Sequence, residues 1–547
     1  MNQEKKIDKR VKTLQEEYAR RAEERKDLER TWLICMNYYA GNQYAELMPT
    51  GAIARTAKKY PWQMTSVFNH IAPIIESRLA KFNKMKTDVS CFPASTEEKD
   101  VLSSLFSSRL IRAAQEENAF KKKVEEGAFW AEICGTAFYK VCWSKDKGPL
   151  VADGVRDGDV EITVCPPYEL YPDDLTATDV NACNSIIHAR AYPVETVEKR
   201  FGVRVKSDDP GVMTKAKEGK SGAFSDRKEG FVLVLEEYVA PTVAYPDGRL
   251  LIVAGDSVLY DGVLPYVTER ENGRGFPFVR QVAIPSPASF FGNGLVERMI
   301  PIQRAYNELK NRKHEFFNRI TAGVIVAEDG SVDVDELAED GIAPGKIIVY
   351  RQGCNPPQML NLGSVPAEFG DEEDRLLKEF ITVSGVSDFM LTGTINDKNY
   401  SGAALSVLTE QNNNRLCVTT ESIKSAIREV AVKTLRLYKQ FATDERLKAL
   451  ENGNEGEADA FRNSDLRSDD LALETENGNV DSVADKRGLA KQIYEMNLLT
   501  DENGKMSEQG KRKLLALLGC EGFAAPDLQK EDPSKTESEI KNTETQN

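Results

Sequence analysis

The residue types that carry most enzyme chemistry are sparse in this chain and do not form known motifs. Its three histidines, His70, His188 and His314, have no paired spacing of the kind that binds a metal. Gly292-Asn-Gly294 begins like a dinucleotide-binding turn, but the third glycine is absent and Phe290-Phe291 is a poor preceding strand. No phosphate-binding Gly-x-x-x-x-Gly-Lys-[Ser/Thr] loop and no Gly-x-Ser-x-Gly elbow occurs. The sequence therefore predicts no catalytic residue, no cofactor and no metal site.

The cysteines point to structural thiols. Nine of them are scattered singly through the chain, and there is no Cys-x-x-Cys. Because the charged N-terminus also lacks an apolar signal segment, we expect free thiols in a reducing compartment. Cys134 and Cys142 lie among apolar and aromatic neighbours and are predicted to be buried. No window of about 18 uncharged apolar residues exists, so no membrane contact is expected.

The charge of the chain argues against a protein that grips nucleic acid tightly. It has 87 acidic and 72 basic residues, a formal net charge of −15 at pH 7. A protein that holds DNA firmly concentrates lysine and arginine on one face, because phosphate neutralisation supplies most of the affinity. The sequence shows no such concentration. Either nucleic acid is irrelevant to the function, or its contact is weak enough for the polymer to slide.

The clearest structural signal is a helical region between residues 286 and 441. Its first helix has an apolar seam with alternating spacings of four and three, interrupted by one lysine: Leu295, Met299, Ile302, Tyr306, Leu309, Lys313, Phe316 and Ile320. Pro301 predicts that this helix either starts or kinks there. Two short strands are expected between residues 323 and 350. A second helix is predicted at 366–383, with Gly385 as its C-cap, and a third, of about 40 residues, from Ser401.

The rest of the chain predicts an α+β fold that is mainly helical. Helices are expected at 66–85, 96–118 and 120–133, and strands dominate between 148 and 284. Residues 1–31 alternate basic and acidic side chains, which is typical of a solvated helix or of an arm that docks on a neighbour. An acidic stretch ends near residue 485, two helices follow at 486–498 and 507–518, and the chain after 521 is predicted to be disordered.

The order of these elements, over roughly residues 30–520, resembles one family: the portal (connector) proteins of tailed bacteriophages, most closely the short-tailed, P22-type group. Four local motifs support the resemblance. They are Asn69-His-Ile-Ala-Pro-Ile-Ile-Glu-Ser-Arg-Leu79, Cys165-Pro-Pro-Tyr-Glu-Leu-Tyr-Pro-Asp173, Phe291-Gly-Asn-Gly followed by Pro301-Ile-Gln-Arg-Ala-Tyr-Asn307, and Ser401-Gly-Ala-Ala-Leu405. The third is the most specific, because it joins a glycine turn to a Pro-x-Gln-x-x-x-Asn helix.

The resemblance implies a portal fold with wing, stem, clip and crown, assembled as a ring of usually twelve subunits at one capsid vertex. The parts it implies are an N-terminal arm and α+β wing (1–294), stem helix 1 (295–320), clip (321–365), stem helix 2 (366–386), tunnel loop (387–402), long wing helix with acidic segment (403–480), crown helices (481–520) and a disordered tail (521–547). The implied location is the virion, after synthesis in the cytoplasm of the bacterial host.

The implied function is a channel through which double-stranded DNA enters during packaging and leaves during ejection. The partners would be other copies of the chain, the major capsid protein, the large terminase subunit and a tail adaptor. The tunnel loop would present Gly393, Asp397, Lys398, Asn399 and Tyr400 to DNA. The stem would supply sparse positive points in an acidic lumen, Arg304, Lys310 and Lys313. The clip would offer docking residues Glu328, Asp329, Asp333, Asp335 and Glu336.

Three alternatives remain open at this point. The stem cations could form ion pairs between subunits instead of touching DNA. The chain could be a soluble helical enzyme without a recognisable motif. It could also be another structural protein of the phage head–tail junction.

Overall fold

The structure, a computed structural model, describes residues 8–47, 53–55, 63–85, 87–93, 97–152, 155–207, 230–267, 273–322, 324–335, 337, 347–360, 366–386, 402–450, 456–464 and 471–473. The chain divides into two compact units, Met1–Glu474 and Thr475–Asn547. The second unit, with the predicted crown and tail, lies outside the described residues.

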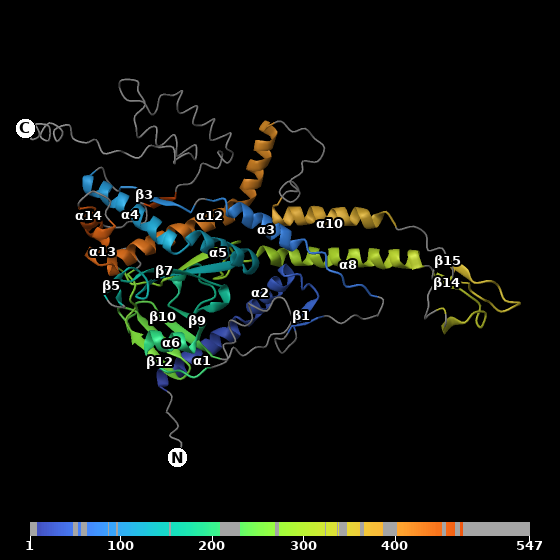
Figure 1. Ribbon diagram of the computed structural model, residues 1–547, viewed down its shortest axis with the longest axis horizontal. Coiled ribbons are helices and arrows are strands. Elements are labelled where there is room, and N and C mark those ends of the chain that lie inside the picture. The colour runs from blue at the N-terminus through green and yellow to red at the C-terminus, as the bar shows by residue number, and fades with distance from the viewer. Residues whose placement is uncertain are drawn as a thin grey trace, which may run out of the picture. The chain divides into compact units, whose positions relative to one another are not determined.

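Two antiparallel sheets form the β-rich part of the first unit (Figure 1). The larger has the strand order β12 (Ser257–Gly262), β11 (Arg249–Ala254), β10 (Phe231–Val239), β9 (Ser185–Pro193) and β8 (Leu170–Pro172). The smaller has the order β13 (Phe278–Val282), β4 (Thr136–Ser144) and β7 (Asp159–Cys165). Their strands are rich in β-branched and aromatic residues, which fit a pleated, buried surface. The strands expected between residues 148 and 284 are confirmed.

Helices cover these sheets and continue the chain on both sides of them. Before the sheets come α1 (Lys9–Glu24), α2 (Lys26–Tyr39), α3 (Ile71–Phe82), α4 (Glu98–Glu117) and α5 (Phe120–Cys134). Within the β-rich part lie α6 (Val194–Phe201) and the 3-10 turns η1 (Pro167–Glu169) and η2 (Val180–Ala182). After it come α8 (Leu295–Ala322), α10 (Glu368–Ser384), α12 (Gly402–Phe441), α13 (Asp444–Ala449) and α14 (Glu457–Asn463).

Four short two-stranded pairings complete the described secondary structure. They are β1 (Ala45–Leu47) with β2 (Ile53–Arg55), β3 (Val89–Cys91) with β16 (Leu471–Leu473), β5 (Leu150–Ala152) with β6 (Val155–Arg156), and β14 (Val324–Val326) with β15 (Gln358–Leu360). No helix among the described residues is both long enough and apolar enough to cross a membrane.

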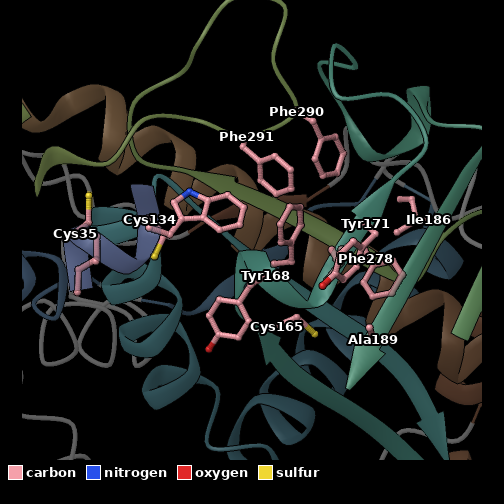
Figure 2. Packing of buried hydrophobic residues seen from close by; sticks show 14 of the residues in the cluster. Cys35, Cys134, Cys165, Tyr168, Tyr171, Ile186, Ala189, Phe278, Phe290 and Phe291 are labelled. Atoms are coloured by element: carbon pink, nitrogen blue, oxygen red, sulfur yellow. The ribbon is translucent and has the colours of Figure 1, made fainter. Parts of the chain in front are cut away.

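An aromatic core joins the sheets to the helices. Phe290 and Phe291, just before α8, meet Phe138 of β4, whose ring stacks on that of Phe290 with centroids 5.5 Å apart. Trp32 of α2 packs edge-on against Phe291 at 5.0 Å. Figure 2 shows Phe290, Phe291 and Phe278 of β13 as members of this core. Each fully buried side chain of this kind contributes about 1.5–3 kcal/mol to folding, so the segment leading into α8 is held firmly.

The charged N-terminal helices bind this same subunit, which corrects the expectation of an arm on a neighbour. Arg21 and Arg25 are buried. Arg21 donates a hydrogen bond to the carbonyl oxygen of Tyr171 at 3.0 Å, and Arg25 donates to that of Tyr168 at 2.8 Å. The Arg25 guanidinium also lies 3.6 Å from the centroid of the Tyr171 ring. A planar group with five donors can satisfy several backbone carbonyls at once. One face of these helices is solvated, as expected, while Arg21 and Arg25 fasten the opposite face to the subunit.

The glycine turn before α8 is a site of close backbone packing. A Cβ added to Gly294 would lie 2.3 Å from the carbonyl oxygen of Ile133, and one on Gly292 would lie 2.1 Å from a methyl group of Val282. Gly135, at φ +91°, faces the same turn, where its Cβ would lie 2.0 Å from the Gly292 carbonyl oxygen. These glycines let two segments approach without side chains between them. The Gly-Asn-Gly pattern thus serves packing at the start of α8.

Replacing Gly294 by alanine should destabilise the protein by about 3 kcal/mol, because the new methyl group meets rigid backbone. Urea denaturation followed by circular dichroism measures the change. The control is Gly370→Ala in α10, where an added Cβ meets nothing within 4 Å. That change should be neutral, or stabilising by up to about 1 kcal/mol through helix propensity. Equal stability of Gly294→Ala and the wild type would contradict the packing argument.

Candidate functional site

The helices α8 and α10 form an antiparallel pair joined by the insert that carries β14 and β15 (Figure 1). The ring of Tyr306 packs edge-on against Phe380 with centroids 6.3 Å apart, and farther along α8 the ring of Phe316 lies 6.4 Å from Phe369. The two helices therefore run antiparallel. The α8 helix begins at Leu295 and contains Pro301 within it, so the alternative of a start at the proline is wrong.

Burial changes sharply along α8. Its first 17 residues include eight apolar or amide side chains that are buried, the last of them Asn311. From Arg312 to Ile320 every side chain is half-buried or exposed. The pair is thus anchored in the subunit at one end, while its other end exposes apolar groups such as Phe317.

A ladder of polar side chains holds α8 to an extended segment, residues 63–70. The ladder residues, which lie four apart on α8, are Gln303, Asn307, Asn311 and Glu315. Their side-chain oxygens accept hydrogen bonds from the backbone N–H groups of His70, Phe68, Ser66 and Met64 at 3.0, 3.0, 3.0 and 2.8 Å. Gln303 and Asn311 also donate to the carbonyl oxygens of Phe68 and Ser66 at 2.7 and 3.0 Å.

The ladder works because two different repeats nearly coincide. Four residues of α-helix rise about 6 Å, and two residues of extended chain span about 6.6 Å. Every second N–H group of the segment therefore meets the next side chain of one helix face. Gln303, Asn307 and Asn311 are buried, and the ladder gives these amides partners in the backbone of a half-buried segment.

The sequence contained a signal for this ladder that its interpretation missed. The Pro-x-Gln-x-x-x-Asn motif supports the family resemblance, but that resemblance predicts no role for its two amides. Amide side chains repeated at four-residue spacing beside an apolar seam indicate a buried polar contact. Which segment they would bind could not be read from the chain, because the partner lies more than 230 residues away.

A buried arginine anchors the other helix of the pair. Arg78 of α3 donates to both carboxylate oxygens of Glu132 on α5, at 3.0 and 2.9 Å. It also donates to the carbonyl oxygen of Ser384, the last residue of α10, at 2.8 Å. Gly385 caps that end at φ +69°, donating its N–H to Ile381, as the sequence predicted. Two helices and the end of α10 therefore meet at one guanidinium.

The predicted stem cations are all engaged within one subunit. Lys310 and Lys313 both form ion pairs with Glu373 of α10, the second at 3.0 Å. Arg304 donates to the hydroxyl of Tyr38 at 2.6 Å. Burial raises the pKa of the Glu373 carboxyl, but hydrogen bonds from the two lysines outweigh this and leave the pKa below its ordinary value. The sequence had left DNA contact and pairing between subunits open, and it did not foresee pairing inside the subunit.

The insert exposes both acidic and apolar side chains. Of the predicted docking residues, Glu328, Asp329, Asp333 and Asp335 are exposed, and Glu336 lies outside the described residues. Ile347 and Val349 are 84% and 80% exposed, and Val326, Met359 and Leu360 are exposed as well. The sequence predicted acidic docking residues in the insert and did not predict this apolar surface. The predicted tunnel-loop residues, Gly393, Asp397, Lys398, Asn399 and Tyr400, lie outside the part of the chain that the structure describes.

Comparison with protein families gives the class of the protein. A family model described as Phage P22-like portal protein matches residues 11–482. The chain belongs to the P22-like phage portal family, as its resemblance predicted. No curated protein matches the chain. Membership of this family favours the portal interpretation over a soluble helical enzyme and over another head–tail component.

Removing one side chain of the ladder should weaken the attachment of α8 to residues 63–70. Asn307→Ala leaves the Phe68 N–H without its acceptor, and the buried amides of Gln43 and Gln303 lose a partner as well, which should cost about 2 kcal/mol. Hydrogen–deuterium exchange should show faster exchange in residues 66–70. The control is Glu308→Ala, which removes an exposed side chain from the same helix. Unchanged protection of this segment in Asn307→Ala would argue against the ladder.

The Glu373 pairs should make stability depend on pH. Because the pKa of Glu373 is lowered in the folded protein, its contribution is present above the ordinary value of 4.5 and is lost as the pH falls through the folded value. Glu373→Gln should lower the free energy of unfolding by about 1 kcal/mol at pH 7. This difference should shrink in acid, as measured by urea denaturation across pH. Glu379→Gln, exposed on the same helix, is the control; a pH-independent difference would contradict the assignment.

Proposed function

We propose that this chain is the portal subunit of a tailed phage and closes into a ring, of usually twelve copies, at one vertex of the capsid. The pair α8–α10 would form the stem that walls the channel, and the insert would form the clip. The supporting observation is the helix pair itself, which is anchored in the subunit at one end and unburied at the other. Membership of the portal family supports the same assignment.

The surfaces left open by one subunit fit a second copy. Among the described residues, β14 and β15 pair only with each other, and a two-stranded sheet is marginally stable alone and leaves two edges open to pairing. The exposed Ile347 and Val349 lie in the same insert. Neighbouring subunits in a ring would cover these side chains and supply partners for the strand edges.

The two stem helices also carry opposite charge. The α8 sequence has six basic and three acidic residues, whereas α10 has six acidic and two basic. In a closed ring, α8 of one copy would stand beside α10 of the next, so each contact between copies would bring opposite charges together. This complementarity favours ordered closure over random association.

The channel would carry double-stranded DNA without sequence preference. Each subunit has a formal net charge of −15, so a ring of twelve would carry roughly −180, and its field would repel the phosphate backbone. The stem lysines Lys310 and Lys313 are already paired with Glu373, so they would offer little positive charge to bind the DNA phosphates. The predicted tunnel loop, with Lys398 and Tyr400, would supply the remaining contacts. The insert would meet the large terminase subunit during packaging and a tail adaptor afterwards, and the outer surface would meet the major capsid protein.

Light scattering and negative-stain microscopy of the purified protein test this proposal. Twelve subunits of 61.0 kDa should give a particle of about 700 kDa with a central hole. The double variant Ile347→Asp/Val349→Asp should shift the protein toward smaller species, because buried unpaired charges would oppose assembly. Val243→Asp is the matched control, since Val243 is fully exposed outside the insert. A wild-type protein that stays monomeric at high concentration would refute the ring.

A further inference from the structure

A buried cluster in the β-rich part has no role in the proposed channel. It consists of Cys165 at the end of β7, Glu169 in η1 and His188 in β9, all of them buried. The Sγ atom of Cys165 lies 3.6 Å from Nε2 of His188, and Oε2 of Glu169 lies 3.5 Å from the same nitrogen. Figure 2 places Cys165 at the edge of the aromatic core, near Tyr168 and Ala189. A thiol, a carboxylate and an imidazole nitrogen thus converge on one point.

The two separations that involve His188 are those of ligands on one zinc ion. With Zn–S near 2.3 Å, Zn–N of about 2.0–2.1 Å and Zn–O of about 2.0–2.2 Å, two ligands on a tetrahedral ion lie roughly 3.3–3.6 Å apart. The distances of 3.6 Å and 3.5 Å match this range, and all three ligand atoms lie within 4.8 Å of one another. A mixed set of thiolate, imidazole and carboxylate suits zinc and disfavours magnesium and calcium, which prefer oxygen ligands.

Side chains behind the cluster are arranged to orient its ligands. The other ring nitrogen of His188, Nδ1, lies 3.5 Å from Oε2 of Glu236 and 3.4 Å from Nζ of Lys140, and these two groups pair with each other at 2.5 Å. A metal-binding histidine commonly donates its second N–H to a carboxylate, which fixes the ring and its tautomer. The Nε atom of Arg190 lies 3.9 Å from the second carboxylate oxygen of Glu169. This leaves Oε2 of Glu169 turned toward the histidine and the cysteine.

The Glu169 carboxylate is an independent sign of a missing ligand. Its side chain is fully buried, and neither of its oxygens accepts a hydrogen bond within the described residues. A buried carboxylate without hydrogen bonds is costly unless a cation compensates for it. The nearest cationic groups, His188 and Arg190, stand at 3.5 and 3.9 Å, which is too far for strong hydrogen bonds.

We propose that Cys165, Glu169 and His188 bind a structural zinc ion, with water or a second oxygen of Glu169 completing the coordination. The ion would join the end of β7 in the three-stranded sheet to β9 in the five-stranded sheet. It would therefore fix the two sheets against each other. The proposal does not depend on ring formation, because all three ligands come from one subunit. The sequence did not suggest it, since the ligands are separated by 4 and 19 residues and fit no paired metal-binding spacing.

Zinc analysis of the full chain tests the proposal. Protein made in zinc-supplemented medium and dialysed against a chelator should retain about one zinc per subunit by mass spectrometry, as expected for a buried site. Cys165→Ser and Glu169→Gln should each lower the retained zinc at least about tenfold. Cys142→Ser is the matched control, because Cys142 lies on the neighbouring strand β4 outside the cluster and its loss should leave the zinc content unchanged.

Two further measurements keep the test decisive if a ligand variant fails to fold. Wild-type protein made with Co²⁺ in place of zinc should show the absorption of a tetrahedral cobalt–thiolate site. Wild-type protein made in zinc-depleted medium should melt at a lower temperature than the zinc-containing form, because a ligand that binds only the folded state stabilises it. Wild-type protein without stoichiometric zinc would overturn the proposal and leave His188 as an imidazolium between Glu169 and Glu236. Zinc retained equally by Cys165→Ser would overturn it too.

Discussion

The hydrogen-bond ladder between α8 and residues 63–70 is the constraint on which the rest of this structure depends. It fixes the long helix to the subunit through backbone groups, and backbone hydrogen bonds do not depend on the side chains of the extended segment. Asn307 also donates to Gln43 at 2.6 Å, and Asn311 to Tyr44 at 2.8 Å, so the ladder reaches the chain just after α2. Since these amides are buried and satisfied, they specify one register of helix against strand.

The second helix of the pair depends on a different kind of contact. Arg78 and Glu132 form a buried, bidentate ion pair. The Nη1 group of Arg78 also donates to the carbonyl oxygen of Ser384, the last residue of α10. Such a pair adds little net stability compared with a well-packed apolar contact, but leaving either charge alone would be costly. Its effect is therefore positional: α10 can end at only one place relative to α3 and α5. The ladder holds the middle of α8 and Arg78 holds the end of α10, and the contact of Tyr306 with Phe380 joins the two helices within the span of the ladder.

The sequence predicted the helices of this region well because each is governed by local rules. The apolar seam predicted nearly the full length of α8, and Gly385 correctly predicted where α10 ends. The predictions failed where the deciding contact was distant in sequence. Lys313 looked like a break in the seam, and only the partner Glu373, 60 residues away, explains it. The buried Arg21 and Arg25 looked solvent-exposed for the same reason, since their carbonyl partners lie about 145 residues further along the chain.

The direction of the ladder has a mechanical consequence. Residues 63–70 run antiparallel to α8, and their hydrogen bonds point across the helix axis, from each backbone N–H group to a side chain. A pull along α8, such as a load applied at the insert, would stretch all rungs at once in shear instead of opening them one after another. Bonds loaded together resist far more force than bonds peeled in turn. The attachment of α8 to residues 63–70 should therefore resist a force along the helix axis better than a force across it.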